Sequence, residues 1–95
     1  MKIEVTSRHH DYSRRIRNYA EEKVENLEKY YDRIIHAHVV LDKRSEGEEA
    51  EFDIHIPGKN FIAKDLTDDI TKSIDSASKK VARQLKTYVE KRNER

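Results

Sequence analysis

Residues 66–92 read LTDDITKSIDSASKKVARQLKTYVEKR, and this stretch determines how the rest of the chain folds. Its apolar residues recur at spacings of three and four, the period of an α-helix with one apolar side; they are Ile70, Ile74, Ala77, Val81, Leu85 and Tyr88. We expect Thr67 to cap the helix, with Asp68 and Asp69 at the positive end of the helix dipole. About 25 helical residues would extend roughly 38 Å.

The basic residues of this helix lie off its apolar side; they are Lys72, Lys79, Lys80, Arg83, Lys86, Lys91 and Arg92. A solvated surface helix often has this pattern, so the charge of the whole chain must be considered. The net charge is only +1. Residues 70–95, however, carry eight basic and three acidic side chains, whereas residues 45–69 carry two basic and eight acidic ones. The chain therefore has two electrostatic sides, and one of them would attract a polyanion.

The composition indicates one small domain that spans residues 1–95. Apolar residues make up 35% of the chain and charged residues 41%, so the core must be small and helped by the apolar stems of long charged side chains. The chain lacks cysteine, which excludes disulfides and thiol chemistry and fits a cytoplasmic location. It has neither an apolar stretch of about 18 residues nor a signal-peptide run, so we expect no membrane association.

Upstream of the long helix, the sequence predicts four strands and one further helix. Apolar and polar residues alternate in four segments, as in half-buried strands; these are residues 2–6, 33–41, 49–56 and 60–65. A charged loop around Gly47 joins the second and third strands, and residues 57–59, Pro-Gly-Lys, form a turn. The apolar spacing between the first two strands predicts a helix over residues 14–29, capped by Ser13 or, as the alternative, by Asp11.

This order of elements gives an α+β fold of the type β-α-β-β-β-α. The helix between the first two strands makes a crossover, which leaves those strands parallel, and the hairpins make the other pairs antiparallel. Both helices should pack on one face of a four-stranded sheet, as in double-stranded-RNA-binding-like domains, and leave the other face wet. We expect Ile34 on the outer face. The inner face should carry Ile35, Ala37, Val39 and Leu41 from the second strand and Ala50, Phe52, Ile54 and Ile56 from the third.

No spacing of residues marks an enzyme active site. The two glycines do not form a phosphate-binding loop, and no nucleophile elbow or metalloprotease helix is present. If Asp42 pairs with Glu49 across the hairpin, four polar residues gather on the outer sheet face: His36, His38, Asp53 and His55. Such groups bind transition metals, but histidines on a wet sheet face are commonly ordinary polar residues. We therefore expect no metal, no cofactor and no small-molecule substrate.

The basic residues of the two helices form the better candidate site. If the helices lie side by side, their outer faces form one basic surface, which would bind phosphate backbones without reading base sequence. Domains that recognise RNA by shape use such surfaces. We expect Tyr30, Tyr31 and Tyr88 to pack in the core rather than stack on bases. The candidate RNA-binding residues are Arg14, Lys23, Lys79, Lys80, Arg83, Lys86, Lys91 and Arg92.

Five short motifs, in order along the chain, mark a similarity to a known family. They are LEKYYDRI at residues 27–34, AHVVL at 37–41, HIPGK at 55–59, SID at 73–75 and KVARQL at 80–85. Together they resemble the ribosome hibernation-promoting factor family, also called ribosome-associated inhibitor or sigma-54 modulation proteins. The resemblance extends through essentially the whole chain, in the same order of elements.

The resemblance implies the β-α-β-β-β-α fold and binding to the small ribosomal subunit and its ribosomal RNA. The implied site is the channel that holds messenger RNA and transfer RNA. A protein in that channel would silence ribosomes and promote their hibernation in starved or stationary-phase cells. Basic positions typical of the family are matched here by Lys23, Lys80, Arg83, Lys86 and Lys91.

The chain departs from the family pattern in two places. The family often has an acidic-Asp-Met-Tyr-Ala-Ala run where residues 68–73 read DDITKS, and Thr87 and Val89 replace basic residues near the end of the second helix. The chain resembles a short form without the domain that pairs ribosomes into dimers, or a long form cut at its linker. The alternatives to a ribosome-binding inhibitor are a generic double-stranded-RNA-binding module and a metal-binding or protein-interaction domain that uses the outer sheet face.

We expect zinc or nickel at low micromolar concentration to leave the melting temperature of the protein unchanged. A ligand raises the melting temperature only when it binds the folded state preferentially, and the outer-face histidines are expected to hold no metal. Thermal unfolding with and without each metal measures this. A large increase that disappears when His36 and His55 are both changed to Ala would show that the histidines do bind metal.

Overall fold

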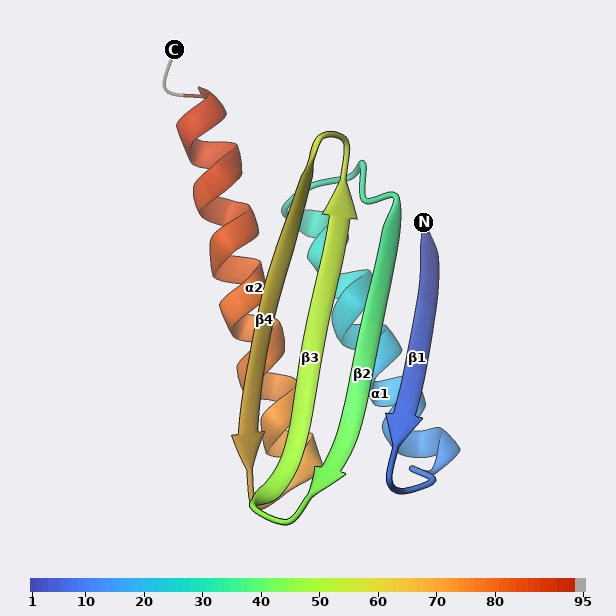
Figure 1. The fold of residues 1–95 in the computed structure, drawn as a ribbon. Coiled ribbons are helices and arrows are strands. Elements are labelled where there is room, and N and C mark those ends of the chain that lie inside the picture. Colours follow the sequence, from blue (N-terminus) through green and yellow to red (C-terminus); the bar gives the residue numbers. More distant parts are fainter. Residues whose placement is uncertain (94–95) are drawn as a thin grey trace.

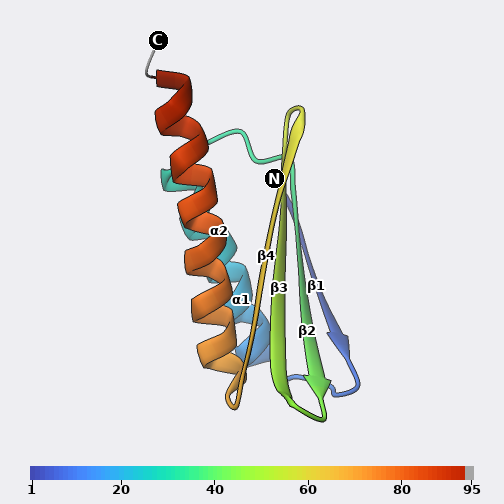
Figure 2. The ribbon, with the colours of Figure 1, turned by 60° about the vertical axis from the view of Figure 1, so that its left-hand side comes forward.

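The computed structural model describes residues 1–93 and has a four-stranded sheet and two helices. The elements, in chain order, are β1 (Lys2–Arg8), α1 (Arg14–Asn26), the 3₁₀ turn η1 (Leu27–Lys29), β2 (His36–Arg44), β3 (Gly47–Ile56), β4 (Lys59–Thr67) and α2 (Ile70–Asn93). Both helices cover the same face of the sheet (Figure 1, Figure 2). No described helix has the length and hydropathy of a membrane-spanning segment.

The sheet has the strand order β1-β2-β3-β4, with β1 parallel to β2 and the other neighbours antiparallel. The predicted α+β fold and the predicted strand directions are therefore confirmed. The hairpin register is also as predicted, because Asp42 lies opposite Glu49 and His38 lies opposite Asp53. This register places the histidines of β2 on the sheet face that the helices leave open.

β1, β3 and β4 are longer than predicted, whereas β2 has the predicted length but lies three residues further along the chain. The hairpin loop between β2 and β3 is correspondingly shorter. β1 and β4 extend to Arg8 and Thr67, and β2 and β3 pair as far as Arg44 and Gly47. A Cβ atom at Gly47 would lie 2.6 Å from the carbonyl oxygen of Thr67. Glycine is therefore required where the end of the hairpin meets the end of β4.

The inner face of the sheet and the apolar side of α2 form the core. Most residues predicted to face inward in β2, β3 and α2 are fully buried; these are Ala37, Val39, Leu41, Ala50, Phe52, Ile54, Ile56, Ile74, Ala77, Val81 and Leu85. Tyr30, Tyr31 and Tyr88 are half-buried and pack against this core. The two-residue period of β3 and the helical period of α2 thus identified the core correctly.

The prediction for Ile34 and Ile35 is wrong. Ile34 is 5% exposed and belongs to the core, whereas Ile35 is 50% exposed. β2 begins at His36, so the alternation of the strand does not extend back to these two positions. The backbone of Ile35 nevertheless joins the sheet, because its N–H donates to the carbonyl oxygen of His55 (2.9 Å).

The two helices begin in different ways. Ser13 caps α1 as predicted, since its hydroxyl accepts the Ile16 N–H (3.3 Å). The prediction that Thr67 caps α2 is wrong, because the pairing of β4 with β3 continues through Thr67. The Asp69 carboxylate caps α2 instead and accepts the Thr71 N–H (2.9 Å).

We expect Phe52→Ala or Leu85→Ala to lower the free energy of unfolding by roughly 2–5 kcal/mol, because each leaves a cavity in the contact between β3 and α2. This is a large part of the total stability of a small domain, about 5–10 kcal/mol. Urea unfolding measures the loss. A variant that melts within a degree or two of the parent would show that the replaced side chain is not part of the core.

Candidate nucleic-acid interface

The outer faces of α1 and α2 form the side of the molecule opposite the open sheet face (Figure 2). Among the predicted RNA-binding residues, Lys23 is half-buried; those with exposed side chains are Arg14, Lys79, Lys80, Arg83, Lys86, Lys91 and Arg92. The structure does not bring them into one cluster. It distributes them over a groove beside Tyr30, a link between the helices, a contact with the sheet edge, and the ends of the helices.

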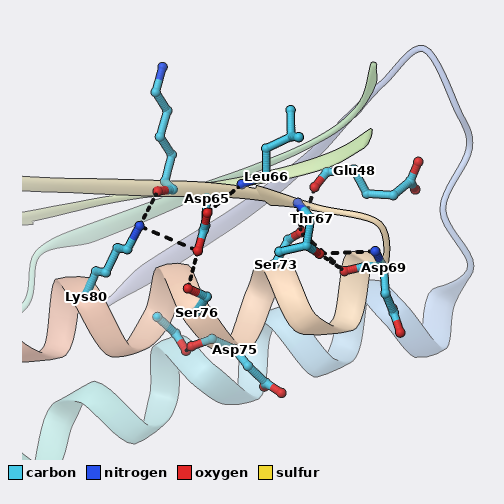
Figure 3. Close-up of polar contacts among 11 residues, drawn as sticks. Glu48, Asp65, Leu66, Thr67, Asp69, Ser73, Asp75, Ser76 and Lys80 are labelled. Atoms are coloured by element: carbon cyan, nitrogen blue, oxygen red, sulfur yellow. Dashed lines mark hydrogen bonds and ion pairs between the residues drawn. The ribbon is translucent and has the colours of Figure 1, made fainter. Parts of the chain in front are cut away.

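A buried serine fixes the start of α2 against the sheet. Ser73 is fully buried, and its hydroxyl donates to the Glu48 carbonyl (2.6 Å) and accepts the Thr67 N–H (3.1 Å) (Figure 3). One side chain of the helix thereby satisfies a carbonyl of β3 and an N–H of β4. Together with the apolar side of α2, this contact sets the rotation of the helix about its axis, and therefore the direction of every basic side chain on it.

Three cations and a tyrosine line a groove where η1 meets α2. Lys79, Arg83 and Lys86 lie about one turn apart on α2, and Tyr30 and Ala82 complete the groove, whose volume is about 300 Å³. We refer to it as the Tyr30 groove. Among residues 1–93, no carboxylate oxygen lies within 4.0 Å of any of the three cationic groups. Their charges are therefore available to an external anion.

Lys23 links the two helices. Its Nζ lies 3.4 Å from the Asp75 carboxylate of α2 and 5.0 Å from the centre of the Tyr19 ring. The Tyr19 hydroxyl donates to the same carboxylate, and this hydrogen bond raises the pKa of Tyr19. Burial lowers the pKa of Lys23, but Tyr19 and Asp75 outweigh burial and the net shift is upward. Lys23 therefore remains charged, with Asp75 as its counter-ion.

Lys80 lies on the side of α2 that faces β4. Its Nζ donates to the Lys64 carbonyl (3.3 Å) and lies 3.5 Å from the Asp65 carboxylate (Figure 3). The Asp65 carboxylate also accepts the Ser76 hydroxyl, and this hydrogen bond is the main cause of the lowered pKa of Asp65. The structure thus separates Lys80 from the Tyr30 groove and gives it a partner at the edge of the sheet.

The remaining predicted cations lie near the ends of the helices. Arg14 lines a second groove, of about 590 Å³, together with Arg15 and Thr71, where the start of α1 approaches the start of α2. Lys91 and Arg92 lie in the last turn of α2. Positive charge is therefore present at both ends of the helical layer, on either side of the link between Lys23 and Asp75.

The histidines of the open sheet face have partners within the protein. His36 Nε2 lies 3.0 Å from the Glu4 carboxylate, and His38 Nε2 lies 2.8 Å from the Thr6 hydroxyl. The hydrogen bond with His36 is the main cause of the lowered pKa of Glu4. In the part of the chain that the structure describes, no three histidine, cysteine, aspartate or glutamate side chains are arranged to hold a metal ion.

Comparison with known proteins identifies the family. The sequence profile described as "Sigma 54 modulation protein / S30EA ribosomal protein" matches residues 3–93. The chain belongs to this family. The ribosome hibernation promoting factor of Azotobacter vinelandii is 30% identical over 95 residues, which cover 100% of this chain and 89% of that protein. The ribosome-associated factor Y of Haemophilus influenzae is 34% identical over 85 residues, which cover 90% of this chain and 79% of that protein.

Two solved structures share the fold. The crystal structure of the Thermus thermophilus Protein Y N-terminal domain has a TM-score of 0.84 and 28% identity, and the match covers 93% of this chain and 99% of that one. The structure of a ribosomal subunit interface protein from Coxiella burnetii has a TM-score of 0.85 and 25% identity, with 93% and 97% covered. The family predicted from the sequence motifs is therefore confirmed, and it is a family of ribosome-associated factors rather than of enzymes.

We expect Asp65→Asn to lower the stability at neutral pH by about 1 kcal/mol, the typical net contribution of a hydrogen bond. The pKa of Asp65 lies below its ordinary value of 3.8 in the folded state. Its charge therefore stabilises the fold above that value, and the stabilisation is lost as the pH falls through the folded-state pKa. The difference in urea midpoint between parent and variant should be largest near pH 7 and should decrease as the pH falls below 3.8. A difference that stays constant as the pH falls through the acid range would contradict this assignment.

Proposed function

We propose that the protein binds the small ribosomal subunit through its ribosomal RNA, in the channel for messenger RNA and transfer RNA. In this way it would inhibit translation and promote ribosome hibernation in starved or stationary-phase cells. The observation that carries the proposal is the Tyr30 groove, in which three exposed cations have no carboxylate partner among residues 1–93. The names of the relatives, a ribosome hibernation promoting factor and a ribosome-associated factor, support the same role.

The distribution of charge supports an approach of RNA from the helical side. β3 places Glu49, Glu51 and Asp53 on the open face of the sheet, where they would repel a phosphate backbone. The helical side carries the cations of the Tyr30 groove and those at both helix ends. Attraction of this kind does not depend on base sequence, and it suits a folded RNA that is recognised by its shape and its phosphates.

Occupancy of the channel would be sufficient for inhibition. A protein that fills the space of messenger RNA or transfer RNA prevents their binding without any chemical step. The proposed role therefore requires no catalysis, no cofactor and no small-molecule substrate. It places the site of action in the cytoplasm, on the ribosome.

A generic double-stranded-RNA-binding module is the second candidate function. The position of Arg14 at one end of the helical layer and of Lys91 at the other favours contact with an extended RNA surface, which a duplex would also offer. Competition separates the two functions. Messenger RNA with initiator transfer RNA should displace a factor from the decoding channel, whereas a generic module should remain bound to ribosomes.

We expect the triple variant Lys79→Glu, Arg83→Glu, Lys86→Glu to lose ribosome binding while it keeps its fold, because the three side chains are exposed. Each phosphate contact releases condensed counterions, so binding by the parent should weaken steeply with salt. Sedimentation with ribosomes on sucrose gradients at two salt concentrations measures the binding. Circular dichroism and thermal unfolding establish that the variant is folded.

The matched control places the same charge change on the strands. Lys2, Lys43 and Lys64 are exposed residues of β1, β2 and β4, so their triple change to Glu alters the net charge equally but leaves both helices and the Tyr30 groove unchanged. The control should keep most of its ribosome binding. If the folded groove variant binds ribosomes as well as this control does, the proposed interface is wrong.

A further inference from the structure

Tyr30 differs from the other four tyrosines in its surroundings. The hydroxyl groups of Tyr12, Tyr19 and Tyr31 form hydrogen bonds with side chains, and the ring of Tyr88 packs against two other aromatic rings. Within residues 1–93, Tyr30 has neither a hydroxyl hydrogen bond nor an aromatic neighbour. It is half-buried and lines a groove, so part of its surface is available to a ligand.

The end of η1 and the core together position Tyr30 beside the cations. η1 ends at Lys29, the Tyr30 N–H donates to the Leu27 carbonyl (3.0 Å), and the side chain of Tyr30 packs against the core. The Lys29 ammonium lies 5.3 Å from the centre of the ring and adds a fourth positive charge to those of Lys79, Arg83 and Lys86. The ring is therefore positioned by the fold before any ligand arrives, which lowers the entropy cost of binding.

We propose that the Tyr30 groove binds one unpaired nucleotide of the RNA, with its base stacked on the Tyr30 ring and its flanking phosphates on Lys79, Arg83 and Lys86. The inference rests on the proposed function, because it takes RNA as the partner. Unstacked bases bind aromatic side chains in single-stranded RNA recognition, and a volume of about 300 Å³ lies at the lower end of the range of small-ligand pockets, about 300–1,000 Å³. The three cations span about 10 Å of helix axis, so they can contact more than one phosphate of a strand that follows the groove.

Stacking and phosphate contacts differ in their salt dependence, and this difference gives the test. A lost phosphate contact reduces the slope of log affinity against log salt by about one, whereas a lost stacking contact lowers the affinity equally at every salt concentration. The probes are a fluorescein-labelled octaadenylate RNA and a labelled RNA hairpin whose fully paired stem is closed by an ethylene-glycol linker, so that it has no unpaired nucleotide. Fluorescence anisotropy at three salt concentrations gives the dissociation constants.

We expect Tyr30→Leu to weaken octaadenylate binding about tenfold, a value within the range of base–aromatic stacking, with an unchanged salt slope and unchanged hairpin binding. Tyr30→Phe should bind like the parent, because it keeps the ring. Tyr31→Leu is the matched control and should also bind like the parent, because Tyr31 faces Tyr88 and not the groove. Lys79→Gln should weaken both probes and reduce the slope.

The inference is overturned if Tyr30→Leu binds octaadenylate like the parent, if it loses hairpin binding equally, or if its salt slope falls. Nuclear magnetic resonance of the parent provides a test that needs no variant: octaadenylate should shift the ring protons of Tyr30 upfield and leave those of Tyr31 in place, and the absence of such a shift contradicts stacking. Ribosome sedimentation is read separately. If the parent binds octaadenylate through Tyr30 but does not bind ribosomes, the inference about the groove stands and the proposed function is wrong. If the parent binds ribosomes but its octaadenylate binding does not depend on Tyr30, only the inference about the groove is wrong.

Discussion

The burial of the apolar side of α2 against the inner face of β3 determines the arrangement of the rest of the molecule. Phe52 and Ile54 on the strand and Val81 and Leu85 on the helix are all completely buried. Because the apolar side of α2 must face the sheet, the rotation of the helix about its axis is fixed. Each polar residue of α2 is therefore directed to the sheet edge, to α1 or to solvent according to its position in the helical turn. The placement of charge on this protein is thus a consequence of its hydrophobic core.

Lys79 and Lys80 show how sharply this constraint acts. They are adjacent in sequence, but a residue step in an α-helix rotates the side chain by about 100°. Lys80 is directed to the outer edge of β4, where it binds a carboxylate, and Gln84 one turn later donates to the Ile62 carbonyl (3.2 Å). Both side chains satisfy carbonyl groups of an edge strand that would otherwise be open to pairing with another chain. Lys79 is directed to the Tyr30 groove and has no such partner among the described residues. One side of α2 therefore contacts the edge strand β4, and another side lines the Tyr30 groove.

The sequence predicted the order of elements, the strand directions, the hairpin register and the core, because these depend on periodic patterns of apolar residues. Predictions from the sequence were wrong where a periodic pattern ended or where a residue could take part in either of two structural elements. Ile34 and Ile35 lie just before β2, where alternation no longer applies. Threonine is a common N-cap residue, but Thr67 pairs with β3 as the last residue of β4. Tyr30 packs against the core as predicted, but a single sequence does not reveal that part of its surface also lines a groove. The number of basic residues in the sequence does not reveal which lysines have a carboxylate partner in the folded protein and which do not.

The open sheet face and the helical side differ in how many of their charged side chains have a partner of opposite charge. On the open sheet face, two carboxylates lie beside basic partners: Glu4 beside His36 and Glu49 beside Arg44. Asp75 on α2 and Asp65 on β4 each bind one lysine of the helices, so two of the predicted RNA-binding cations already have a carboxylate partner. What remains are the cations at the ends of the helices and the small set grouped around the Tyr30 ring. If this surface binds RNA as proposed, it would gain affinity from few phosphate contacts, and its specificity would then come from shape and stacking rather than from the total positive charge of the chain.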